Sequence, residues 1–99
     1  MNFHDILSEN RSILTIFSVQ NCAECTALKK YYTEWGTAFL DVDCTDEKAR
    51  FRAFLESNGF ISTGEKFTYP VVFKNNKIVK ICSYNIGNRY IHIVFDDKP

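Results

Sequence analysis

The chain has 99 residues, of which 45% are hydrophobic and 15% aromatic, enough for one core that forms without disulfides or a structural metal. Twelve Lys and Arg side chains balance twelve Asp and Glu, and no basic run could neutralise a phosphate backbone, so nucleic acid is not expected as a partner. No apolar stretch approaches the roughly 20 residues of a membrane span, and residues 1–10 lack the basic-then-apolar order of a secretory signal. We therefore expect a single domain over residues 1–99, cytoplasmic, monomeric and without membrane contact.

Hydrophobic spacing predicts alternating helices and strands in the first part of the chain. A short opening helix is expected over residues 3–10, and residues 13–19 form an apolar, β-branched run typical of a strand buried on both faces. Helical spacing returns over residues 25–35, where Lys29 falls on the solvent face and Gly36 is placed to end the helix. This order indicates a strand at the centre of a sheet with helices on either side of it.

The middle of the chain repeats the pattern of strand and helix. Residues 38–42 predict a second strand, and residues 46–55 predict a third helix that Asn58-Gly59 ends. Residues 60–66 contain few core side chains and indicate a loop.

Strands are expected to dominate near the C-terminus. Residues 71–73 and 77–83 predict two short strands, joined by Asn75-Asn76, a pair that tolerates positive φ and suits a tight hairpin turn. Residues 86–96 are ambiguous, because their apolar spacing suits a helix while residues 90–95 are rich in β-formers. For this last segment we favour a helix.

Cys22 and Cys25 lie three positions apart, where the predicted strand gives way to a helix. At the first helical turn, unpaired backbone N–H groups and the positive end of the helix dipole stabilise a thiolate at Cys22. The neighbouring carboxylate of Glu24 opposes this effect. Cys25, one turn further on, would be more buried and close enough to attack a mixed disulfide formed at Cys22, so the pair predicts a reversible two-electron switch.

The same pair could instead be half of a metal site, or two buried thiols without chemistry. Zinc takes about four ligands, and the other candidates, Cys44, Cys82, His4 and His92, are isolated in the sequence. We therefore expect no metal, ordinary core cysteines at Cys44 and Cys82, and surface or capping roles for both histidines. A zinc or iron–sulfur centre at the pair is the alternative.

The order of these features resembles the thioredoxin superfamily, and in size it is most similar to the glutaredoxins. "FSVQNCAEC" falls where glutaredoxins carry an aromatic-Ser-Lys lead-in to Cys-X-X-Cys, and "FTYPVVF" matches their Thr-X-Pro-X-X-Phe pattern. The likeness covers nearly the whole chain in order and spacing. It implies an α/β, thioredoxin-like fold: a central mixed four-stranded sheet flanked by helices, with a short N-terminal helix.

The resemblance also implies a dithiol thiol–disulfide oxidoreductase, in which Cys22 is the nucleophile and Cys25 the resolving thiol. It implies that Pro70 is cis and faces the cysteines, and that the main chain of Tyr69 binds an extended substrate as an added strand would. Further substrate-binding positions implied by the motif are Thr68, Ala23 and Glu24.

Partners and cofactors follow from the same resemblance. It implies protein or mixed disulfides as substrates, ribonucleotide reductase among them, no tightly bound cofactor, and recharging by glutathione or by a thioredoxin reductase. The Gly-Gly-acid stretch that binds glutathione in the family is replaced here by residues 81–85, and Val19 stands where a lysine is usual. For this reason we name glutathione only as one candidate co-substrate. The alternative of another class is a non-catalytic binding module that docks a partner at Pro70.

Overall fold

The computed structural model of residues 1–99 describes residues 2–81, 85–86, 89–90 and 95–96. The helices and strands are α1 Phe3–Glu9, β1 Leu14–Ser18, α2 Ala23–Glu34, β2 Phe39–Asp43, the 3₁₀ turn Thr45–Glu47, α3 Lys48–Ser57, β3 Val71–Lys74, β4 Lys77–Ile81, β5 Asn85–Ile86, β6 Arg89–Tyr90 and β7 Phe95–Asp96. The predicted α/β class and the short N-terminal helix are confirmed. None of the helices in the described part of the chain has the length and apolar character that crossing a bilayer requires.

The main sheet is mixed, with strand order β2-β1-β3-β4-β7. β2 runs parallel to β1, and the other neighbours are antiparallel. The four longer strands form the mixed four-stranded sheet expected from the sequence, and the two-residue β7 adds a fifth strand beside β4. β1 lies between two partners and all five of its residues are buried, as its unbroken apolar run predicts.

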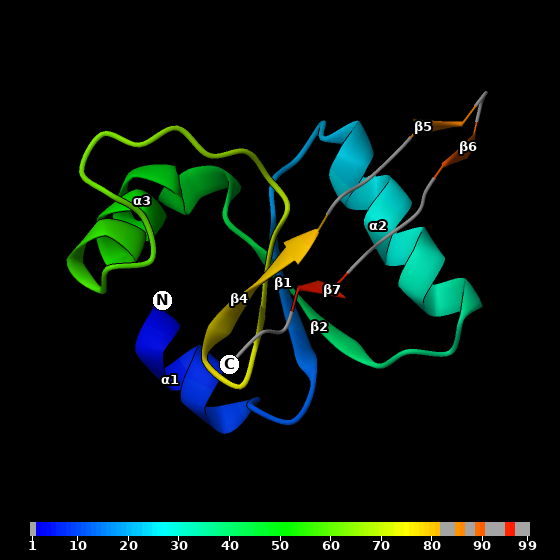
Figure 1. The fold of residues 1–99 in the computed structure, drawn as a ribbon, viewed down its shortest axis with the longest axis horizontal. Helices are drawn as coiled ribbons and strands as arrows, with labels where there is room; N and C mark the ends of the chain where they lie inside the picture. Colours follow the sequence, from blue (N-terminus) through cyan, green and yellow to red (C-terminus); the bar gives the residue numbers. More distant parts are fainter. Residues whose placement is uncertain (1, 82–84, 87–88, 91–94, 97–99) are drawn as a thin grey trace.

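Helices cover both faces of this sheet (Figure 1): α1 and α3 lie on one side and α2 on the other. Successive side chains of a strand point to opposite faces. Phe17 of β1 and Phe73 of β3 accordingly join the cluster beneath α1 and α3, whereas Ile16 and Val72 join the cluster beneath α2. The strands thereby connect two apolar layers, and α2, the helix that begins at the cysteine pair, packs against β1.

Local signals fix the ends of the helices. The Oδ1 atom of Asn2 accepts the N–H of Asp5 at 3.1 Å and caps α1. Gly36 and Gly59 follow α2 and α3 with φ angles of 70° and 75°, a conformation that glycine adopts without a steric penalty. The hairpin turn between β3 and β4 is Asn75-Asn76, with φ angles of 53° and 60° as expected.

The helix predicted over residues 86–96 is wrong at the described positions. Asn85–Ile86 pairs antiparallel with Arg89–Tyr90, and Phe95–Asp96 pairs with β4. Strand pairing satisfies the backbone groups of β-branched and aromatic residues here, and this outweighs a helical spacing that rested on few apolar positions. Residues 87–88 and 91–94, and residues 82–83 at the end of the predicted strand 77–83, lie outside the described part of the chain.

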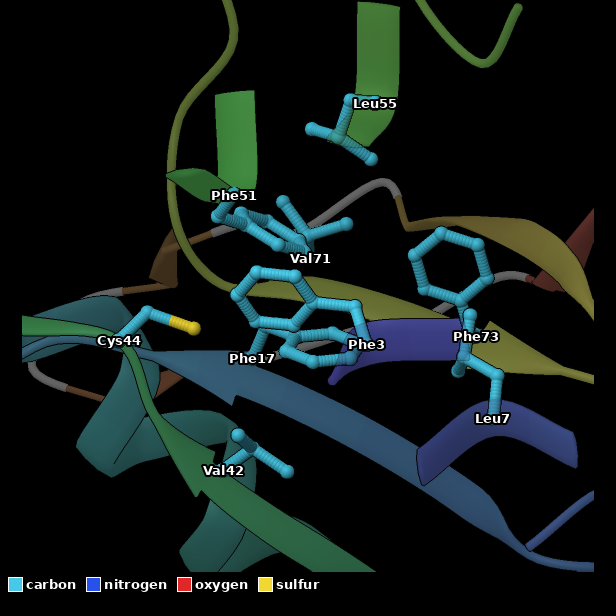
Figure 2. Packing of buried hydrophobic residues seen from close by; sticks show 9 residues of the cluster. All are labelled: Phe3, Leu7, Phe17, Val42, Cys44, Phe51, Leu55, Val71 and Phe73. Atoms are coloured by element: carbon cyan, nitrogen blue, oxygen red, sulfur yellow. The ribbon is translucent and has the colours of Figure 1, made fainter. Parts of the chain in front are cut away.

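Phe51 packs against other rings of the cluster beneath α1 and α3 (Figure 2). Its ring is 0% exposed and lies 4.6 Å from the ring of Phe17 and 5.2 Å from that of Phe3, measured between centroids. Phe51→Ala should therefore lower the free energy of unfolding by about 3–5 kcal/mol, measured by urea denaturation. Trp35→Ala is the control, because Trp35 is 71% exposed and its loss should cost about 0.5 kcal/mol or less. Equal losses in the two variants would contradict this assignment of the core.

Candidate functional site

Cys22 is the residue that caps α2. β1 ends at Ser18, Asn21 turns the chain with a φ of 58°, and Cys22 is extended, with φ −115° and ψ 105°. Its Sγ atom accepts the backbone N–H of Cys25 at 3.1 Å, as the side-chain oxygen of Ser or Asp does at a helix N-cap. The sulfur is therefore at the end of the helix where backbone amides stabilise negative charge.

Cys22 and Cys25 are joined by a disulfide at the start of α2. Their Cα atoms are 5.3 Å apart, within the range that a disulfide spans. Cys22 is half-buried, whereas Cys25 is 1% exposed. Of the two cysteines, Cys22 is therefore the one that has a surface in contact with solvent.

The turn at Pro70 lies against Cys22, although 47 residues separate Tyr69 from Cys22 in the sequence. The Tyr69–Pro70 peptide bond is cis, as the resemblance implied. The carbonyl oxygen of Tyr69 lies 3.7 Å from Cys22 Sγ, so a reduced thiol at Cys22 can donate a hydrogen bond to it. The structure thus brings together the two motifs on which the resemblance rests.

The side chain of Tyr69 turns away from this meeting point. Its ring lies 5.9 Å from that of Phe51 and 5.4 Å from that of Phe67, and its hydroxyl is buried without a hydrogen-bond partner among the described residues. Burial raises the pKa of Tyr69 to about 12, so the hydroxyl stays neutral. Tyr69 presents its main chain, and not its ring, to the cysteine.

The other predicted contact residues are at the surface around the pair. Ala23 and Glu24 are exposed in the first turn of α2, and Thr68 is exposed one residue before Tyr69. Their role in substrate binding stays a prediction.

Cys44 is a core residue, as expected. It follows β2 and is 0% exposed, and its sulfur points toward the rings of Phe17 and Phe51 (Figure 2). Burial raises the pKa of Cys44 to about 12, and three nearby carboxylates, Asp43 foremost, act in the same direction. This thiol is therefore neutral at physiological pH and is not available as a nucleophile.

Among the described residues, the other metal-ligand candidates do not gather at the pair. His4, on α1, is exposed, which fits a surface role. Its Nε2 atom lies 3.1 Å from Oδ1 of Asn58, the residue that follows α3. Cys82 and His92 lie outside the described residues. Over residues 2–81 and the short described strands beyond, no three His, Cys, Asp or Glu side chains are close enough together to bind a metal ion.

The sequence did not reveal a charged pair that joins α2 to β2. Lys29, one turn after Cys25, places its Nζ atom 2.9 Å from Oδ2 of Asp41, and Ser18 donates to the other carboxylate oxygen at 2.7 Å. Helical periodicity predicts that Lys29 faces solvent. It cannot show that the edge strand β2 runs beside that face of α2. The pair is about one third exposed, so it contributes at most about 1 kcal/mol to stability.

Comparison of the chain with models of known protein families and with curated proteins found no match. Its β1–α2–β2 start with two parallel strands, its mixed sheet and its Cys-X-X-Cys disulfide at the start of a helix are together consistent with a thioredoxin-like fold. The cysteine disulfide also points to thiol–disulfide chemistry.

Proposed function

We propose that this chain is a thioredoxin-like thiol–disulfide oxidoreductase of the dithiol, glutaredoxin kind. The observation that carries the proposal is the position of Cys22. This half-buried residue caps α2, its sulfur accepts the N–H of Cys25 at 3.1 Å, and the same sulfur is bonded to that of the buried Cys25. A helix N-cap favours the thiolate, which is the nucleophile in disulfide exchange. A purely structural disulfide would not require that one of its cysteines be only half-buried at this place.

The reaction begins with the reduced pair. The Cys22 thiolate attacks one sulfur of a substrate disulfide, forms a mixed disulfide with it, and releases the other substrate sulfur as a thiolate that takes up a proton. The Cys25 thiol then loses its proton to solvent and attacks the Cys22 sulfur, releasing the second substrate thiolate. Two electrons pass to the substrate, and the pair ends as the disulfide of this structure. A cellular thiol reductant then returns two electrons and two protons.

The proposed substrates are disulfides of proteins, with ribonucleotide reductase as one such acceptor. An extended segment that carries the target disulfide would pair with the main chain of Tyr69, whose carbonyl oxygen is 3.7 Å from Cys22 Sγ. Thr68, Ala23 and Glu24, all exposed around this point, would border it. Recycling by glutathione and its reductase, compared with recycling by thioredoxin reductase, identifies the cellular reductant.

The proposal is tested by alkylation in two redox states. Iodoacetamide applied to the reduced protein should modify Cys22 and reduce dithiothreitol-driven turnover of insulin disulfides to the rate without protein, because the nucleophile is lost. The same treatment of the oxidised protein should leave turnover intact, because Cys22 is then held in the disulfide and is not available for alkylation. Mass spectrometry identifies the modified residue.

The untreated protein provides the decisive comparison. If its turnover of insulin and of a small disulfide equals that of the reagents alone, the chain is not an oxidoreductase. If the affinity for a partner is then unchanged by reduction, oxidation or alkylation of the protein, the alternative of a non-catalytic binding module is favoured.

A further inference from the structure

The segment that leads into the proline turn has no regular structure of its own. Residues 58–70 connect α3 to β3 without a helix or a strand, and residues 62–66 are all exposed. A connection of this length without secondary structure is uncommon in a compact domain and is usually functional or disordered. The position of the turn therefore depends on contacts from neighbouring elements.

Two charged side chains of α3, Arg52 and Glu56, make such contacts, and we call them the α3 clamp. Arg52 Nη1 donates to the carbonyl oxygen of Glu65 at 2.9 Å and to Oε2 of Glu56 at 3.2 Å. The same carboxylate oxygen accepts the N–H of Gly64 at 2.9 Å. This backbone hydrogen bond lowers the pKa of the Glu56 carboxyl, so it stays charged at neutral pH. The clamp thereby binds the main chain of the connection at two adjacent residues.

The clamp also reaches the proline turn through an aromatic ring. The guanidinium carbon of Arg52 lies 5.0 Å from the centroid of the Phe67 ring, a distance typical of a cation–π interaction. Phe67 in turn meets the ring of Tyr69 edge-on, at 5.4 Å between centroids. Because the Tyr69 carbonyl oxygen is 3.7 Å from Cys22 Sγ, a continuous series of contacts leads from α3 to the sulfur of Cys22.

We propose that Arg52 and Glu56 are positioning residues, which keep the main chain of Tyr69 at the place beside Cys22 where an extended substrate pairs with it. The inference rests on the proposed oxidoreductase function. A peptide that pairs with the Tyr69 backbone needs that backbone in one position before it binds. A small disulfide needs only access to the sulfur of Cys22, which the clamp does not touch. Loss of the clamp should therefore impair peptide substrates selectively.

The test compares two arginine variants on two substrates. Arg52→Met keeps the length of the side chain but removes its hydrogen bonds and its charge, so we expect KM for a disulfide-linked peptide to rise about tenfold, the effect of one charge-assisted hydrogen bond. The kcat for 2-hydroxyethyl disulfide should stay unchanged. Arg50→Met is the matched control, because Arg50 lies on the same helix and pairs with Glu47 at 3.3 Å, outside the connection. It should leave both substrates unaffected.

The possible results distinguish a failure of the clamp's positioning role from a failure of the proposed oxidoreductase function. A wild-type protein that reduces neither substrate would refute the proposed function. A wild-type protein active on both, with the same peptide KM in Arg52→Met and Arg50→Met, would overturn the role of the clamp alone. Should Arg52→Met fail to fold, as judged by thermal unfolding, Glu56→Gln replaces it: a peptide KM about threefold above wild type supports the inference, and an unchanged KM overturns it.

Discussion

Replacing Cys22 with serine should reduce disulfide turnover to the uncatalysed rate, a loss of roughly 10³-fold or more. A serine hydroxyl is not ionised at neutral pH, so neither the N–H of Cys25 nor the dipole of α2 can produce an attacking anion from it. The fold should survive the change, because serine is itself a favoured N-cap residue and its oxygen can accept the same N–H. The rate is measured with insulin and dithiothreitol, and thermal unfolding shows that the variant is folded.

Cys44→Ala is the control for Cys22→Ser, since it also removes a thiol. Cys44 is fully buried on the α3 side of the sheet, and burial keeps its thiol neutral, so turnover should stay at the wild-type level. A Cys22→Ser protein that kept a tenth or more of the wild-type rate would show that another group attacks the substrate.

The parts of the fold that the sequence predicted are those set by local patterns. β1 is an unbroken apolar run between helical patterns, and a strand of that kind is stable only when neighbours cover both of its faces. The turn at Asn75-Asn76 needs residues that tolerate positive φ, and few residue types do. The position of Cys22 followed from the same logic, because a strand that ends just before a helical pattern places the intervening cysteine at the helix N-cap.

The parts that sequence reasoning missed depend on contacts between distant segments. The segment 86–96 carried a helical spacing, but its described residues form strands, and pairing partners such as β4 for β7 are not visible in a local window. Arg52 and Glu56 have the spacing of an ordinary helical ion pair, which gives no sign that a backbone segment beyond the helix also binds to them. Hydrophobic patterns cannot show where a loop lies.

The meeting of the two motifs could be predicted from a resemblance only. No periodicity links Cys22 to Tyr69 across 47 residues, and the cis bond at Pro70 is an uncommon state for an X–Pro bond. The resemblance to the glutaredoxins predicted both the proximity of Tyr69 to Cys22 and the cis bond. It did not predict the direction of the Tyr69 side chain. The ring packs against Phe51 and Phe67, so the group of Tyr69 that faces Cys22 is the backbone, which is the same for every residue type.

Replacing Cys25 with serine should have the opposite signature to the loss of Cys22: the first exchange step proceeds and the second does not. In the wild type the two sulfurs are close enough to bond, so resolution is intramolecular, with an effective concentration on the order of 10⁵ M or more. Serine cannot form the second disulfide, and the substrate should stay attached to Cys22. Incubation with excess insulin, followed by mass spectrometry without reductant, should show nearly complete conversion to the adduct.

The helix N-cap explains why Cys25→Ser should trap the intermediate without weakening the attack. The group that stabilises the Cys22 thiolate is the backbone N–H of residue 25, at 3.1 Å, and a change of side chain leaves that group in place. The double variant Cys22→Ser/Cys25→Ser is the matched control and should form no adduct. An adduct mapped to Cys44 would mean that Cys22 is not the attacking residue. No adduct at all, in a variant whose Cys22 is still reactive, would mean that Cys25 is not the resolving thiol. Because Cys25 is 1% exposed, we expect it to take part in the exchange only after Cys22 has formed its bond to the substrate.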